Sequence, residues 1–122
     1  MINLLLSDRA KDYLICDADH PLISGGKLLE ELIVYNIHAS LIQELTKSFA
    51  SLSGCDITFN TDVSELSGGQ KVILMFLLAI HSSAPRILFI DLLKYLDPVR
   101  REGVLDLIEM FSSRKQILLE SR

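Results

Sequence analysis

The chain has 122 residues, of which 49% are hydrophobic and 23% are charged, and its formal net charge is −4 at pH 7. This length predicts a single domain over residues 1–122 that can bury a core. The acidic balance comes without a stripe of Lys and Arg, so we expect no nucleic-acid groove. No apolar run approaches the roughly 18 to 20 residues of a membrane span, and residues 1–6 lack the basic flank of a signal peptide. We therefore expect a cytoplasmic protein.

The cysteines and histidines give no sign of a metal centre. Cys16 and Cys55 lie far apart and outside any CxxC or Cys/His pattern, which predicts neither a disulfide nor a metal site. His20, His38 and His81 also lack ligand spacing, and we interpret all three as structural.

The first part of the chain has the order strand, glycine-containing loop and helix. Residues 13–17 predict a short strand, residues 18–27 a loop, and residues 28–34 a helix. This order is that of a phosphate-binding P-loop, but Pro21 stands where the first Gly of that motif is needed. Leu28 replaces the Ser or Thr that would hold Mg²⁺. A nucleotide site around residues 24–27 is therefore only one of the interpretations kept open.

Residues 37–53 predict a second helical stretch. Apolar residues recur there at intervals of one, three and four and would share one helix face: Leu41, Ile42, Leu45, Phe49 and Leu52. With residues 28–34 this gives a helical region from about residue 28 to residue 53, followed by an irregular or extended piece at 55–60.

The stretch LSGGQ at residues 66–70 precedes an apolar run at residues 72–80. Ser67 can cap the helix that this run predicts, and Gly68 and Gly69 have no Cβ that would keep a ligand away from their N–H groups. A helix start of this kind favours an anion such as a phosphate. A capped helix after an ordinary turn explains the same residues, because Ser-Gly-Gly is common in loops.

The run at residues 72–80 is apolar on every side, so the helix must be buried all round. It could lie in the centre of the core. Alternatively, one face that includes Ile73 and Leu78 could pack against another chain.

The last third of the chain alternates strands and a helix. Residues 86–90 form a continuous apolar run that ends in Asp91, as in a parallel strand buried on both faces. Pro98 begins an amphipathic helix that ends near residue 112, and residues 116–119 predict a final strand. These elements predict an α/β fold with a small parallel sheet.

Three motifs, in order and at near-family spacing, resemble those of the ATP-binding cassette (ABC) ATPases. LSGGQ at 66–70, preceded by VSE, is similar to the signature, RILFID at 86–91 to the Walker B strand, and LDP at 96–98 to the D-loop. The resemblance covers about residues 12–122. It implies a truncated P-loop NTPase-like domain whose strands contain Tyr13, Ile87 and Ile117. Residues 28–65 would form the helical subdomain, and residues 66–122 the signature helix, Walker B strand, D-loop, final helix and strand.

The chain departs from the family at the positions that carry catalysis. No Walker A motif is present, and the position of the Q-loop glutamine falls on Cys16. Leu92 follows Asp91 where the family has a glutamate that polarises water, and the turn from Asp91 to Asp97 is one residue shorter. The position of the switch histidine falls on Arg122. We therefore expect no catalytic residue in this chain and no hydrolysis by the chain alone.

In this family two ATPase domains hold ATP between them, and the signature of one contacts the γ-phosphate held by the Walker A motif of the other. The resemblance thus implies a P-loop ATPase or transporter subunit as partner, with ATP and Mg²⁺ only if the partner shares them. Residues at the trans nucleotide site would be Ser67, Gly68, Gly69 and Gln70. Asp97 would line the interface. Asp91 would be the Walker B residue, at most a weak, water-mediated Mg²⁺ ligand.

Two other interpretations stay open. The chain could be an ABC-derived interaction or scaffold module that no longer binds nucleotide, or a small ATPase that uses residues 24–27. The spelling of the signature, with Gln70, and the absence of a coiled coil favour the transporter branch of the family over its DNA-repair branch. The apolar composition and the missing half of the sheet are expected to drive self-association or partner binding, and contact with a membrane would be indirect.

Overall fold

The structure, a computed structural model, describes residues 12–122. The elements, in chain order, are β1 (Leu14–Asp17), α2 (Leu28–Val34), η1 (Ala39–Leu41), α3 (Ile42–Ser53), η2 (Val63–Glu65), α4 (Gly68–His81), β2 (Arg86–Ile90), α5 (Pro98–Phe111) and β3 (Gln116–Glu120), where η marks a 3₁₀ helix. The strands form one parallel sheet in the order β1-β2-β3. This arrangement confirms the predicted α/β fold and its small parallel sheet. Tyr13, predicted to lie in the first strand, comes just before β1.

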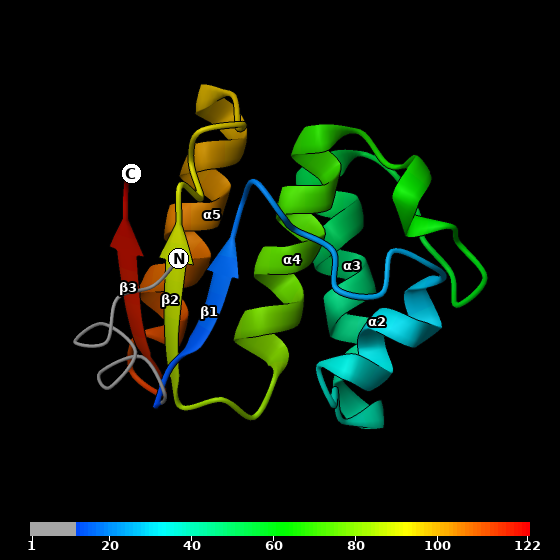
Figure 1. Ribbon diagram of the computed structural model, residues 1–122, viewed down its shortest axis with the longest axis horizontal. Helices are drawn as coiled ribbons and strands as arrows, with labels where there is room; N and C mark the ends of the chain where they lie inside the picture. Colours follow the sequence, from blue (N-terminus) through cyan, green and yellow to red (C-terminus); the bar gives the residue numbers. More distant parts are fainter. Residues whose placement is uncertain (1–11) are drawn as a thin grey trace.

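The molecule has the sheet and α5 at one end and the helical region at the other, with α4 between them (Figure 1). The strand registers place Leu14, Ile87 and Ile117 on the face of the sheet that packs against the hydrophobic core. Phe89, on the same face, is fully buried, and its ring centroid lies 5.5 Å from that of Phe76 on α4. This aromatic contact fixes α4 against the central strand.

Helix α4 is the centre of the core, as one of the two interpretations of its sequence predicted. All of residues 72–81 are buried, and Ile73 and Leu78 have no exposed surface. The alternative, in which Ile73 and Leu78 pack against another chain, is wrong. The sheet and α3 already cover the faces of α4 that a partner would need.

The predicted helix over residues 37–53 is broken at its start. Asn36 ends α2 with a left-handed φ of 54°, and His38 is extended and accepts a hydrogen bond from the Ser40 N–H. The chain then makes the short turn η1 before α3 begins at Ile42. Helix α3 ends at Gly54, whose φ of 71° gives the left-handed C-cap that glycine adopts without strain.

Within residues 12–122, none of the helices has both the length and the apolar character needed to cross a bilayer.

Truncation of Leu78 on α4 should test its place in the core. We expect Leu78→Ala to lower the free energy of unfolding by about 2 to 5 kcal/mol, because it removes buried methyl groups and leaves a cavity. The control is Ile33→Ala, whose side chain is 68% exposed on α2 and whose loss should change stability by no more than about 0.5 kcal/mol. Urea unfolding followed by circular dichroism measures both, and similar losses in the two variants would contradict this packing.

Candidate functional site

The LSGGQ stretch lies at the amino-terminal end of α4, with Ser67 as the N-cap residue, as predicted. The Ser67 hydroxyl accepts a hydrogen bond from the Gln70 N–H at 3.2 Å, and the Gln70 side-chain oxygen accepts one from the Ser67 N–H at 2.9 Å. This reciprocal pair is a capping box. It directs the Gln70 side chain back to the backbone of its own helix.

The two glycines are not needed by the packing of this chain. Gly68 is exposed, and a Cβ added to it would meet nothing within 4 Å; at Gly69 the nearest atom would be the Tyr95 carbonyl oxygen at 3.4 Å. Neither glycine has a positive φ. Open space above the first turn of a buried helix, with orphan N–H groups, is suited to an anion from outside the chain.

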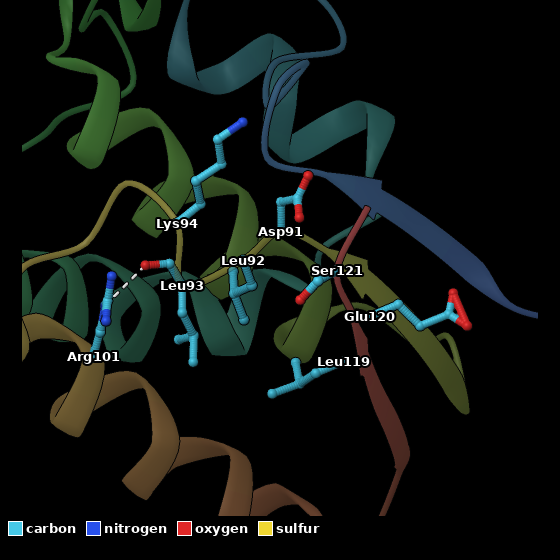
Figure 2. A pocket seen from close by; sticks show the side chains of 8 residues that line it. All are labelled: Asp91, Leu92, Leu93, Lys94, Arg101, Leu119, Glu120 and Ser121. Carbon is cyan, nitrogen blue, oxygen red and sulfur yellow. Dashed lines mark hydrogen bonds between the residues drawn. The ribbon is translucent and has the colours of Figure 1, made fainter.

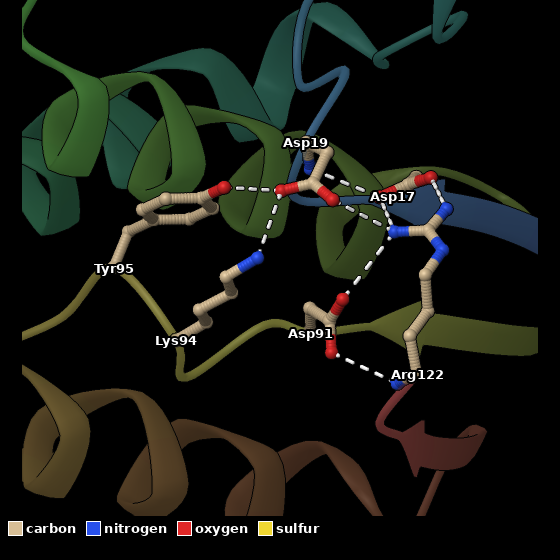
Figure 3. A network of polar contacts seen from close by, with 6 residues as sticks. All are labelled: Asp17, Asp19, Asp91, Lys94, Tyr95 and Arg122. Atoms are coloured by element: carbon tan, nitrogen blue, oxygen red, sulfur yellow. Dashed lines mark hydrogen bonds and ion pairs between the residues drawn. The ribbon is translucent and has the colours of Figure 1, made fainter.

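The carboxyl ends of the three strands meet in a cluster of charged side chains (Figure 3). Arg122 follows β3, and its Nη1 atom lies 3.0 Å from Asp17 Oδ1, 2.9 Å from Asp19 Oδ2 and 3.3 Å from Asp91 Oδ2. A second guanidinium nitrogen, Nη2, also donates to Asp17. The Arg122 N–H donates to Asp91 Oδ1 at 3.1 Å. One guanidinium thus pairs with three carboxylates from two different strand ends.

The charges of this cluster stabilise one another. The hydrogen bond from Arg122 lowers the pKa of Asp17, and the same contact raises the pKa of Arg122. The Tyr95 hydroxyl donates to Asp19 and lowers its pKa, while the bond raises the pKa of Tyr95. Lys94 adds a cation 3.6 Å from Asp19. Two cations of this chain thus offset part of the negative charge of the three carboxylates.

Asp91 lies at the end of β2, where the Walker B resemblance predicts it. Its φ of 57° is left-handed, a conformation that Asp tolerates better than most residues, and its N–H donates to the Glu120 carbonyl of β3 at 2.8 Å. Both carboxylate oxygens accept hydrogen bonds from Arg122. These contacts do not fit a Mg²⁺ site while Arg122 is in place. In the part of the chain that the structure describes, no group of three or more His, Cys, Asp or Glu side chains is arranged so that it could hold a metal ion.

A cavity of about 350 Å³ lies beside this cluster, between the 91–94 turn and β3 (Figure 2). Leu92, where the sequence resemblance would place a catalytic glutamate, is 2% exposed and cannot act as a base. Arg101 donates from Nε to the carbonyls of Leu93 and Leu96 at 3.0 and 2.8 Å. The shortened turn between β2 and α5 is thus held by a side chain of α5.

Asp97, predicted to line an interface, is the N-cap residue of α5. Its Oδ1 accepts the Arg100 N–H at 2.9 Å, and its Oδ2 pairs with the Arg100 guanidinium. The carboxylate is exposed, and its pKa is lowered by these contacts. A Cβ placed on Gly69 would lie 3.4 Å from the Tyr95 carbonyl oxygen, so the 92–97 segment lies beside the LSGGQ stretch. A role of Asp97 at an interface stays a prediction.

The loop at residues 23–26 is filled by a carboxylate of this chain. Glu31 is fully buried and accepts hydrogen bonds from the N–H groups of Ile23, Ser24 and Gly25 at 3.0, 2.8 and 3.1 Å, and from the Ser24 hydroxyl at 3.1 Å. These are the donors that a phosphate would need. The carboxylate occupies the loop in the manner of an internal anion.

The start of α2 is closed as well. The Leu28 and Leu29 N–H groups donate to the carbonyls of Thr61 and Phe59 at 2.9 and 3.2 Å. With the loop donors turned onto Glu31 and the helix donors onto backbone carbonyls, a nucleotide site at residues 24–27 has no free cradle. We therefore correct that interpretation.

Cys16, where the sequence resemblance would place the Q-loop glutamine, has its side chain in the hydrophobic core. It is 3% exposed in the core, and burial raises the pKa of its thiol to about 12. Successive side chains of a strand point to opposite faces, so the neighbouring Asp17, with its side chain in the charged cluster, reaches the site in its place.

Sequence reasoning did not select Asp19, Lys94, Tyr95, Arg101 or Glu31. One signal was available: Asp19 and Lys94 follow parallel strands, whose carboxyl ends meet at one edge of a sheet. Arg101 and Glu31 gave no such signal, because an isolated charged side chain on a helix normally faces solvent.

No protein-family model matches the chain, and no curated protein matches it. Its fold is similar to solved ABC proteins at 18% sequence identity. One is assigned as a cobalt transport ATP-binding protein (cbiO-2), with a TM-score of 0.66 over 98% of this chain and 46% of that one. Another is assigned as a metal-chelate type ABC transporter in an inward-facing conformation, with a TM-score of 0.60 over 90% of this chain and 48% of that one. The chain thus spans less than half the length of either.

Removal of the Arg122 charge should make stability less dependent on pH. Because the pKa of Asp17 is lowered in the folded chain, Asp17 adds stability above the pKa of an unfolded Asp, about 3.9, and this stability is lost as pH falls through the folded pKa. We expect Arg122→Gln to be less stable than the wild type near pH 7, with a difference that shrinks towards about pH 3 in urea titrations. Arg86→Gln is the control, since Arg86 is exposed and makes no ion pair within residues 12–122. A difference that is constant with pH would contradict this role.

Neutralisation of Glu31 should loosen the loop that it fills. We expect Glu31→Gln to cost about 1 to 3 kcal/mol, because the four hydrogen bonds that meet at Glu31 Oε1 lose the negative charge that strengthens them. Amide hydrogen exchange should become faster at residues 23–25. Glu30→Gln is a close control, since Glu30 is exposed and accepts only the Lys27 N–H, at 3.5 Å. Unchanged exchange at residues 23–25 would show that the carboxylate does not hold the loop.

Proposed function

We propose that this chain is an ABC-ATPase-like subunit without a nucleotide site of its own, whose signature contacts ATP held by a P-loop partner. The similarity of its fold to ATP-binding proteins of transporters supports a transporter-type ATPase as the setting. The observation that carries the proposal is the open space above Gly68 at the start of a fully buried helix.

A phosphate at this position would meet backbone rather than side chains. The capping box uses the N–H groups of Ser67 and Gln70, which leaves those of Gly68 and Gly69 to face the open space. The helix dipole adds a partial positive charge at the same point. Glycine in a helix makes the folded state less stable than alanine would. Nothing in the packing of this chain requires glycine at positions 68 and 69, so contact with a ligand would explain them.

The two places in this chain that could otherwise hold a nucleotide or its metal are taken by its own side chains. Glu31 fills the loop before α2, and Arg122 forms ion pairs with Asp17, Asp19 and Asp91 at the strand ends. ATP and Mg²⁺ would therefore come with the partner. Asp97 and the 92–97 segment, next to Gly69, would lie along the same interface.

The second candidate function is an ABC-derived scaffold that does not contact nucleotide. The cluster around Arg122 favours it, because the carboxylates of Asp17, Asp19 and Asp91 already pair with a guanidinium of this chain. The two functions differ in one property, the dependence of partner binding on nucleotide.

The test is capture of partners by the tagged chain with and without Mg²⁺ and a non-hydrolysable ATP analogue, with the retained proteins identified by mass spectrometry. We expect a P-loop protein that is retained only with nucleotide and is lost in Ser67→Arg, whose side chain blocks the open space. The control is Ser51→Arg, at an exposed position of α3. The same partners in both conditions, without a P-loop protein among them, would overturn the proposal and leave the scaffold.

Gly68→Ala separates binding from folding. We expect this variant to be equal to or more stable than the wild type, by up to about 1 kcal/mol, because the added methyl meets nothing in the chain and alanine is the better helix former. We expect it to retain less of the P-loop protein in the presence of nucleotide. A stable Gly68→Ala variant with undiminished retention would mean that no ligand approaches this backbone.

A further inference from the structure

Within residues 12–122, the outer side of β3 is an open sheet edge. The Gln116 N–H donates to the Pro85 carbonyl at 2.9 Å, and the Glu120 carbonyl accepts the Asp91 N–H at 2.8 Å. In a parallel pair alternate residues bond to the neighbouring strand, so Gln116, Leu118 and Glu120 direct their backbone groups towards β2. Ile117 and Leu119 therefore direct theirs outward. Among residues 12–122 no strand pairs with that side, and β3 forms the margin of the described fold (Figure 1).

The middle of β3 carries apolar side chains that favour pairing at this edge. Leu118 and Leu119 are 41% and 43% exposed, although they are neighbours and point to opposite faces. The strand contains neither Pro nor Lys, which natural proteins place on exposed edges to prevent pairing. An edge of this kind is a template for another strand.

We propose that β3 pairs in antiparallel fashion with β3 of a second copy of this chain, which gives a continuous six-stranded sheet. A two-fold axis relates identical edges only in the antiparallel sense. The N–H and C=O groups of Ile117 and Leu119 point outward from β3. The hydrogen bonds between the two copies must therefore form between these residues. Ile117 of one copy then lies opposite Leu119 of the other, with the axis between the two Leu118 residues.

The sequence of β3 is complementary to itself in this register. Gln116 of one copy lies opposite Glu120 of the other, so an amide can donate to a carboxylate, and the two Glu120 carboxylates are kept apart. The pairs that lie between these two polar ends join Ile117 with Leu119 and Leu118 with Leu118, and all are apolar. A shift by one step in either direction places Leu118 opposite Gln116 or Glu120 and loses this match.

The proposed dimer leaves the signature free. In Figure 1 β3 and the helical region lie at opposite ends of the molecule, and α5 lies behind the sheet. A two-fold axis perpendicular to the sheet keeps the helices of both copies on one face. Failure of this pairing would therefore say nothing about nucleotide at Ser67, and the reverse is also true.

The first experiment is sedimentation of the full chain over a range of concentrations. We expect a reversible dimer of twice the 13.7 kDa mass of the chain. Leu118→Lys should weaken it by more than about tenfold, because two ammonium groups would lie opposite each other at the axis. Leu29→Lys is the matched control, since Leu29 is 45% exposed on α2, far from the edge. A monomer at every concentration, or a dimer unchanged by Leu118→Lys, would overturn the pairing.

A cysteine scan tests the register even if Leu118→Lys folds poorly. Residues opposite each other in a non-hydrogen-bonded antiparallel pair have Cα atoms about 4.5 Å apart, within the range of a disulfide. In a Cys55→Ser background, Leu118→Cys should therefore give a disulfide-linked dimer on mild oxidation. Leu119→Cys should not, because Leu119 lies opposite Ile117. Equal linkage of the two variants, or linkage of neither, would overturn the register and with it the proposal.

Discussion

Burial of α4 on all sides is the constraint on which the rest of the structure depends. A helix whose residues 72–81 are all buried must be covered by several elements at once, and here the sheet and α3 supply the cover. The contact between Phe76 and Phe89 fixes the rotation of the helix against β2. Because the sheet and α3 hold α4 on two sides, the position of its exposed first turn is fixed. An exposed backbone loop thus gains the rigidity of the core beneath it.

The chain supplies its own counter-ions at two places where an ATPase would bind ligands. Glu31 is an internal anion in the loop before α2, and Arg122 is an internal cation at the strand ends. Each satisfies donors or acceptors that would otherwise need a phosphate or a metal. The backbone of Gly68 and Gly69 differs from these two places. There, no side chain of the described residues takes the position of a ligand.

The sequence predicted the strands, α4 and its cap because these features are local. Alternation, apolar runs and the Ser67 to Gln70 spacing are set by neighbours in the chain. The break before α3 was missed because the left-handed Asn36 and the capping His38 override a good helical pattern. The cluster around Arg122 was missed because it joins residues about 100 positions apart, and only the order of the strands brings them together.

The two exposed ends of this fold differ in what they can recognise. The signature offers backbone donors around open space, which suits a small anion and says little about the protein that carries it. The β3 edge offers alternating donors and acceptors with apolar side chains, which suits a strand of matching pattern. Because the two ends are separated by the sheet and α4, occupation of one does not block the other. A dimer joined at β3 would therefore present two signatures and could serve two nucleotide sites at once.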